Sequence, residues 1–238
     1  MSKLFLVELK NMFNKFDVKM SILVFALLGL FLGYLNKIND NEFCSSMFEW
    51  IMIITMTISA LGGLFISKDY TQNTIRNKII VGHTRLSIYL SKQFAVSLMY
   101  LASTGAYILT SIISNSIFVG IDNVDFKIMM TSLLVAFFAI IACSSITTFI
   151  SMSLKKETGG LLPLLVMYAL MLVGAMGSEF FKGKVMDFIC EIVPVCQLLF
   201  LNLVSAPLEP LKLIMYSVLI TVMFISGGYY IFKKTNLN

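Results

Sequence analysis

Six long apolar runs, separated by polar links, constrain this chain more than any other feature of its sequence. They extend over about Val18 to Leu35, Met47 to Ile66, Phe94 to Val119, Lys127 to Ser153, Gly160 to Ser178 and Leu211 to Phe232. An α-helix of about 20 apolar residues crosses the hydrocarbon core of a bilayer. Because lipid offers the backbone no hydrogen-bond partners, such runs cross as helices. We therefore predict an all-α, polytopic membrane protein with six transmembrane helices.

The composition agrees with this fold class and excludes an ordinary soluble domain. Hydrophobic residues make up 58% of the chain and charged residues 13%, against roughly 25% charged residues in soluble domains. Six spans leave little of the 238 residues for anything else, so we expect a single transmembrane domain over residues 1–238. The net charge of +5 then reports orientation in the membrane, and we expect no nucleic-acid partner.

Basic residues gather on one side of the six expected spans. Most of the 18 Lys and Arg residues fall together there: Lys3, Lys10, Lys15, Lys19, Lys68, Arg76, Lys78, Arg85, Lys92, Lys155, Lys156, Lys233 and Lys234. The side that is rich in Lys and Arg is normally cytoplasmic. We expect a multi-pass protein of the cell membrane with both termini in the cytoplasm.

Two segments outside the spans are expected to lie at the membrane surface. Residues 1–19 carry four lysines but also Glu8 and Asp17, and the apolar stretch after them lacks a small-residue cleavage site, which favours a retained N-terminal interfacial helix over a cleaved signal. Residues 184–203 carry Asp187, Glu191, Pro194, Gln197 and Asn202 in an otherwise apolar pattern. They are too polar for a lipid-facing helix, so we expect an outer interfacial or re-entrant segment.

The most informative connection is residues 67–92, SKDYTQNTIRNKIIVGHTRLSIYLSK. It predicts two helical pieces that break at Gly82, the first capped by Asp69 or Thr71 and the second, Thr84 to Ser91, by its own hydroxyl residue. In the first piece the apolar residues Ile75, Ile79 and Ile80 are expected on one face, and the polar residues Asn73, Arg76 and Asn77 elsewhere. From periodicity alone the segment is an amphipathic connector on anionic lipid.

The same stretch resembles a segment of the ABC-2 family of transporter permeases. Two spans are followed by the pattern acidic-x-x-x-x-T-I-R-x-K-I-x-x-G-x-x-R-x-x-I-x-x-x-K, carried by Asp69, Thr74, Ile75, Arg76, Lys78, Ile79, Gly82, Arg85, Ile88 and Lys92. Six spans with both ends inside, and a broken segment before the last span, are similar to the family as well. The chain departs from the family at Asn73, where glycine is frequent, and at Gly82, where proline is frequent.

The resemblance implies that the segment is a coupling helix that docks on a separate ATP-binding cassette subunit. The implied coupling residues are Asp69, Thr71, Asn73, Thr74, Ile75, Arg76, Lys78, Ile79, Gly82 and Arg85. The chain lacks the phosphate-binding motif G-x-x-x-x-G-K-[ST], so we expect a transport subunit and no enzyme. ATP and magnesium would belong to the partner, and this chain would carry no cofactor.

The implied function is an ATP-driven exporter whose permease forms a homodimer or heterodimer. The small size of the chain and its composition, rich in Asn, Ile and Lys, resemble permeases of Gram-positive bacteria. Those permeases export antimicrobial or other amphipathic peptides, often in peptide resistance. The alternatives are a drug or lipid exporter permease and the substrate-capture component of an uptake system. A membrane-embedded enzyme would need ionisable groups that converge inside the spans, and the carboxylates stand at the span ends.

Several other residues allow two interpretations. Gly29 and Gly33 form a GxxxG spacing, which fits helix packing either inside one subunit or between subunits. The hydroxyl residues in the fourth run either line a path or bond their own helix: Ser144, Ser145, Thr147 and Thr148.

The remaining polar residues can also be explained without a functional role. Glu49 is either solvated or a proton carrier, and His83, the only histidine, is expected at the surface. Cys44, Cys143, Cys190 and Cys196 have no metal-binding spacing. Cys190 and Cys196 either pack or form a disulfide outside the cell.

Overall fold

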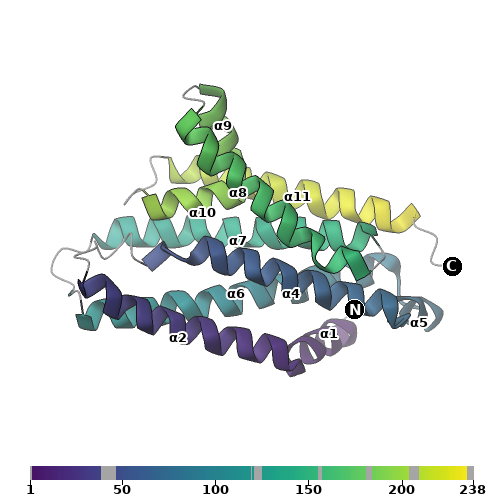
Figure 1. Ribbon diagram of the computed structural model, residues 1–238. Helices are drawn as coiled ribbons and strands as arrows, with labels where there is room; N and C mark the ends of the chain where they lie inside the picture. Colours follow the sequence, from purple (N-terminus) through teal and green to yellow (C-terminus); the bar gives the residue numbers. More distant parts are fainter. Residues whose placement is uncertain are drawn as a thin grey trace.

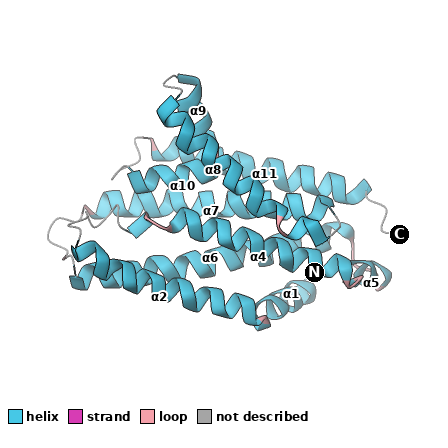
Figure 2. Cartoon of the chain, viewed as in Figure 1, coloured by secondary structure: helices cyan, strands magenta, loops and turns pink. Residues whose placement is uncertain are grey.

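The computed structural model describes residues 2–38, 47–118, 120, 125–154, 157–180, 184–203 and 209–234. In this part of the chain, helices are the only regular secondary structure, which confirms the all-α prediction (Figure 2). The helices are α1 (Ser2–Asn14), α2 (Phe16–Ile38), α4 (Ile51–Thr71), α5 (Thr74–Ile80), α6 (Arg85–Phe118), α7 (Phe126–Leu154), η1 (Glu157–Gly160), α8 (Leu162–Phe180), α9 (Lys184–Ile192), α10 (Pro194–Leu203) and α11 (Pro210–Lys234).

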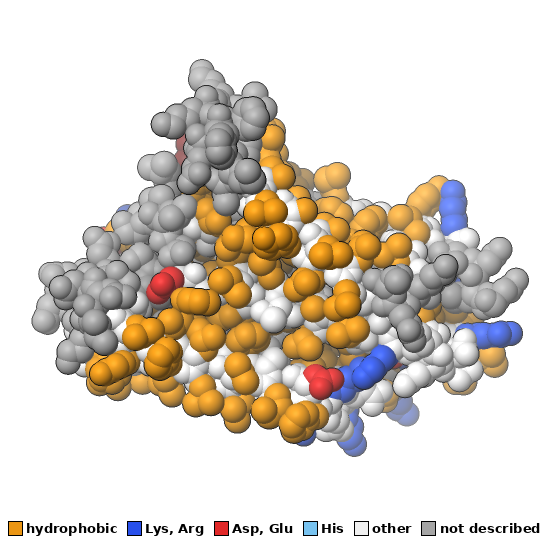
Figure 3. Space-filling model, in the orientation of Figure 1, with side chains coloured by type: hydrophobic (Ala, Val, Ile, Leu, Met, Phe, Trp, Pro, Cys, Tyr) orange, Lys and Arg blue, Asp and Glu red, His pale blue; other side chains and the backbone are white. Residues whose placement is uncertain are grey.

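Among the described helices, five are long and apolar enough to cross a membrane, namely α2, α4, α6, α7 and α11. Apolar side chains cover much of the face seen in Figure 3, as expected for a protein surface that meets lipid. The fifth apolar run of the sequence forms α8, whose apolar stretch within the described side chains, Leu162–Gly174, is shorter. The fold is thus compatible with a multi-pass membrane protein.

The long helices run side by side along the bundle (Figure 1). Helices α4 and α7 lie at its centre and are the most buried of the five spans, whereas α11 is the least buried. Helix α2 packs chiefly on α6, and α11 chiefly on α7. Helices α1 and α5 and the C-terminal end of α11 lie toward the same end of the bundle. The basic side chains in view also gather toward that end (Figure 3).

Two helix boundaries differ from the sequence prediction. Helix α4 continues beyond Ile66 to Thr71, and the piece from Thr84 to Ser91 is the start of the 34-residue helix α6. The backbone N–H of Ser87 donates to Thr84 Oγ1 at 3.2 Å, so the predicted hydroxyl cap is present. No proline follows inside α6, which explains why the helix runs on without a break.

The glycine pair of α2 lies in a contact within one chain. A Cβ atom on Gly29 would overlap Thr110 Oγ1 and the carbonyl oxygen of Tyr107, and one on Gly33 would overlap Ser114. All three neighbours belong to α6. Of the two alternatives for the GxxxG spacing, the structure therefore supports packing inside one subunit. Ser114 Oγ also donates a hydrogen bond to the carbonyl oxygen of Leu30 at 2.8 Å, and the close approach of the two helices makes this bond possible.

The hydroxyl row of α7 bonds its own helix. Four side chains donate to carbonyl oxygens three or four residues earlier, at 2.7 to 3.0 Å: Ser144 to Ile141, Ser145 to Ala142, Thr147 to Cys143 and Thr148 to Ser144. All four are fully buried. The structure thus favours the intrahelical alternative over a path lined by hydroxyl groups.

The segment 184–203 forms two short helices that break before Pro194, which occupies the first position of α10. Buried Gln197 joins it to α11, because Ser217 Oγ donates to Gln197 Oε1 at 2.7 Å and Gln197 Nε2 donates to the carbonyl oxygen of Leu213 at 3.3 Å. Cys196 is a free, buried thiol. It packs against Gly174 of α8, and no disulfide joins it to Cys190.

Candidate functional site

The candidate site is the turn between α4 and α6, with the short helix α5 inside it. Asn73 precedes α5 in the left-handed backbone region, with φ of 55°, which asparagine tolerates better than most residues. Thr74 Oγ1 donates to the carbonyl oxygen of Asp69 at 3.0 Å. The predicted cap by Asp69 or Thr71 is wrong, because both residues still belong to α4 and Thr71 Oγ1 donates to the carbonyl oxygen of Lys68.

The predicted break at Gly82 is confirmed and has the geometry of a glycine helix end. Helix α5 ends at Ile80, and Gly82 has φ of +97°, a conformation that glycine adopts without steric cost. The Gly82 N–H donates to the carbonyl oxygen of Ile79 and the His83 N–H to that of Lys78. These two bonds are the Schellman pattern. They turn the chain directly into Thr84 and α6.

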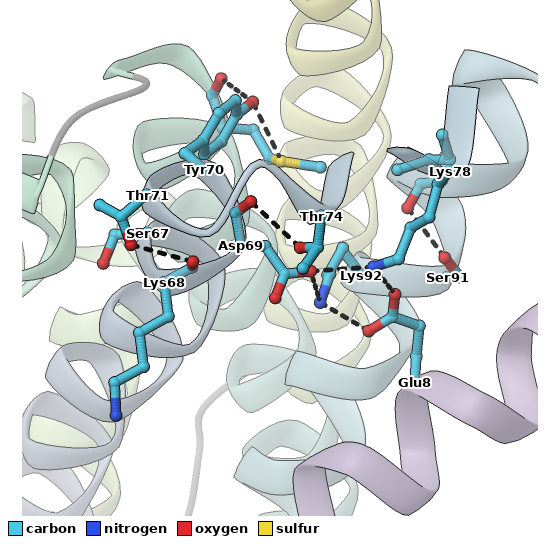
Figure 4. Close-up of polar contacts among 12 residues, drawn as sticks. Glu8, Ser67, Lys68, Asp69, Tyr70, Thr71, Thr74, Lys78, Ser91 and Lys92 are labelled. Carbon is cyan, nitrogen blue, oxygen red and sulfur yellow. Dashed lines mark hydrogen bonds and ion pairs between the residues drawn. The ribbon is translucent and has the colours of Figure 1, made fainter. Parts of the chain in front are cut away.

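Four charged side chains from four helices meet beneath this turn, and we call them the Glu8 cluster: Glu8 of α1, Asp69 of α4, Lys78 of α5 and Lys92 of α6 (Figure 4). Lys78 Nζ lies 2.5 Å from Glu8 Oε1 and 2.9 Å from Asp69 Oδ2. Lys92 Nζ lies 2.5 Å from Glu8 Oε2 and 2.6 Å from Asp69 Oδ2. Each lysine thus bridges the same two carboxylates.

Charge balance makes this burial possible. Two carboxylates and two ammonium groups cancel, and Glu8 and Lys92 are almost fully buried, a position that charged groups occupy only when paired. Burial by itself lowers the pKa of Lys78, but the carboxylates of Glu8 and Asp69 outweigh it and hold that pKa above its ordinary value. Lys78 is therefore charged at neutral pH. Lys92 Nζ also lies 4.0 Å from the centre of the Phe65 ring, a cation–π contact.

The cluster fixes α5 so that one face looks inward and the other outward. Ile75 is 1% exposed and Ile79 is partly buried, whereas Ile80 is 73% and Val81 77% exposed. Arg76 and Asn77 are also exposed. The expectation of one apolar face with Ile75, Ile79 and Ile80 is therefore wrong for Ile80. We call Arg76, Asn77, Ile80 and Val81 the exposed tip.

Arg85 connects the turn with the last helix of the bundle. Its Nη1 donates to the carbonyl oxygens of Phe232 at 3.2 Å and Lys233 at 2.6 Å. These carbonyl groups belong to the C-terminal turn of α11. The last carbonyl oxygens of a helix have no hydrogen-bond donors within their own helix, and this end of the helix attracts positive charge. The guanidinium group therefore holds the start of α6 and the end of α11 together.

The structure places the ten predicted coupling residues in five different environments. Asp69 and Lys78 belong to the Glu8 cluster, and Ile75 and Ile79 pack inward. The turns are formed by Thr71, Asn73, Thr74 and Gly82. Arg85 binds α11, and Arg76 alone of the ten belongs to the exposed tip.

Sequence reasoning missed Glu8, the residue with which both lysines pair. A signal was available, because Leu4, Glu8 and Met12 recur every four residues on the buried face of α1. A carboxylate on an apolar helix face implies a buried cation opposite to it.

No model of a known protein family matches this chain, and no curated protein matches it in sequence.

Proposed function

We propose that this chain is the permease subunit of an ATP-driven ABC-2 type exporter and that the exposed tip docks on a separate ATP-binding cassette subunit. The observation that carries the proposal is the exposure of Ile80 and Val81 beside Arg76 on a turn that a buried ion-pair cluster holds in place. Large apolar side chains at the polar end of a membrane bundle are unfavourable while water surrounds them, and a partner that covers them removes this free-energy cost.

A coupling element must transmit force, and the geometry of α5 suits this task. The Glu8 cluster ties α5 to α1, α4 and α6, and Arg85 ties the adjoining start of α6 to α11. A displacement of the exposed tip therefore acts on several helices together. Reciprocal coupling needs contacts that differ between two states of the transporter, and this turn supplies the connections for it.

In this proposal α8 is the sixth span, which places both termini on the cytoplasmic side together with α5. The gathering of α1, α5 and the end of α11 at one end of the bundle supports it (Figure 1). Helix α1 would lie at the inner interface, and α9 and α10 would form the outer re-entrant or interfacial segment. Two permease subunits and two ATP-binding subunits would make the complete exporter.

For the cargo we propose amphipathic or antimicrobial peptides, exported by a Gram-positive bacterium. The support is the resemblance of the chain to small peptide-exporting permeases, since a fold alone does not define a substrate. Export of drugs or lipids is the alternative within the same mechanism.

The test is purification of the tagged chain from its native membranes, followed by an ATPase assay. The expected result is a co-purifying protein with a G-x-x-x-x-G-K-[ST] motif, and hydrolysis that is lost when the two are separated. Hydrolysis by the separated chain alone, or purification without any protein that carries this motif, would contradict the proposal.

A further inference from the structure

Two lysines near the Glu8 cluster are not part of its charge balance. Lys15 lies between α1 and α2, and its Nζ is 4.4 Å from the centre of the Phe65 ring. Lys68 stands one turn beyond Phe65 on α4, is exposed and points away from the cluster (Figure 4). In the described part of the chain, neither ammonium group lies within ion-pair distance of a carboxylate.

The surroundings of Lys15 are electropositive. Burial lowers the pKa of Lys15, and the positive charges of Lys92 and Lys68 lower it further, while Asp69 and Asp17 act in the opposite direction. Asp69 is already engaged by two lysines in the Glu8 cluster. A half-buried ammonium group beside other cations gains from a bound anion more than a solvated one does, because less water screens the interaction.

One exposed and mainly apolar face of α4 leads to Lys68. The exposed residues Ile53, Thr57, Leu64 and Lys68 follow one another at helical spacing on a single face. The stripe therefore runs from apolar side chains within the span to a lysine at its end. This order of an apolar surface followed by an ammonium group matches an acyl chain followed by a phosphate group.

We infer that Lys15 and Lys68 form a binding site for the phosphate headgroup of an anionic phospholipid, whose acyl chain lies along the exposed face of α4 at Leu64. Phe65 positions the Lys15 ammonium group by the cation–π contact. The site requires only that this end of the bundle lies at the headgroup level, so it does not depend on the ATP-driven cycle. A lipid bound here contacts α1, α2 and α4 at the base of the turn that carries α5.

The experiment measures lipid binding to the purified full chain in detergent by native mass spectrometry. Phosphatidylglycerol is compared with phosphatidylcholine, and inorganic phosphate is added as a competitor. Since a lysine near an anionic lipid surface contributes about a fivefold gain in affinity, Lys15→Gln/Lys68→Gln should bind phosphatidylglycerol about 25-fold more weakly. Lys3→Gln/Lys10→Gln is the control with the same change in charge, because both lysines are exposed on α1, and it should lose less than twofold.

A third variant separates charge from folding. Lys15→Arg/Lys68→Arg keeps both positive charges and should bind phosphatidylglycerol within about threefold of the wild type, since arginine also contacts phosphate and aromatic rings. Equal losses in the Gln variant and its control would overturn the inference. So would equal binding of the two lipids, or displacement of phosphatidylglycerol by inorganic phosphate at equal concentration, which would indicate a site for a free anion.

Discussion

Replacement of Glu8 by glutamine tests how the Glu8 cluster holds the turn between α4 and α6. The amide has nearly the shape of the carboxylate but no charge, so the Glu8 cluster changes from neutral to a net charge of +1. Lys92, almost fully buried, would then share Asp69 with Lys78 at 2.6 and 2.9 Å. Loss of one partner from a buried ion pair costs about 3 to 5 kcal/mol. With about 2 to 4 °C per kcal/mol for a chain of this size, we expect the midpoint of unfolding to fall by about 6 to 20 °C.

The assay is thermal unfolding in detergent, followed by the fluorescence of Trp50, the only tryptophan. The control is Glu209→Gln, because Glu209 is 68% exposed and lies 3.5 Å from Lys212. An exposed pair contributes about 0 to 1 kcal/mol, so this control should change the midpoint by less than about 4 °C.

A double variant tests the charge balance itself. In Glu8→Gln/Lys78→Met, the pair of Lys92 and Asp69 remains neutral, so this variant should unfold at a higher temperature than Glu8→Gln alone. The reasoning is refuted if Glu8→Gln unfolds within about 2 °C of the wild type, or if the additional loss of Lys78 lowers the midpoint further.

Three further predictions follow from single contacts. Gly33→Leu should separate α2 from α6, because its side chain would overlap Ser114; limited proteolysis between the two helices should become faster, and an unchanged pattern would count against this packing. Arg85→Gln should lose the bonds to the end of α11 and free its C-terminal turn, so that amide hydrogen exchange there rises about tenfold; unchanged protection would show that Arg85 is dispensable. An impermeant thiol reagent should label a cysteine at position 37 in intact cells but not one at position 76, and the opposite labelling would invert the proposed orientation.

The parts of the fold that depend on local sequence could be predicted. Apolar run length predicted the five long apolar helices α2, α4, α6, α7 and α11. Gly82 predicted the end of α5, because left-handed backbone at a helix end selects glycine. The spacing of Gly29 and Gly33 indicated a close helix contact. Its partner, α6, could not be identified, because that choice depends on the packing of the whole chain.

The parts that depend on pairing between distant residues could not be predicted. The sequence places Asp69 and Lys92 in the polar connection 67–92, outside the apolar runs, since isolated charges are costly in a helix bundle. Both lie within helices, because Glu8 and Lys78 neutralise them from elsewhere in the chain. Ile75 was expected at a docking surface, yet it is buried under the turn. Truncation to alanine there should cost about 2 to 5 kcal/mol of stability, so it reports on folding and not on docking.

The most direct test of docking by the exposed tip is recovery of the ATP-binding subunit with Ile80→Ser/Val81→Ser. A fully buried side chain of this type contributes about 1.5 to 3 kcal/mol, so the double variant should reduce recovery of the subunit by at least tenfold. The control Leu211→Ser changes a side chain that is 77% exposed on another helix, as exposed as Val81. The account predicts unchanged recovery with this control and normal membrane insertion of both variants. Unchanged recovery with Ile80→Ser/Val81→Ser would contradict docking through α5.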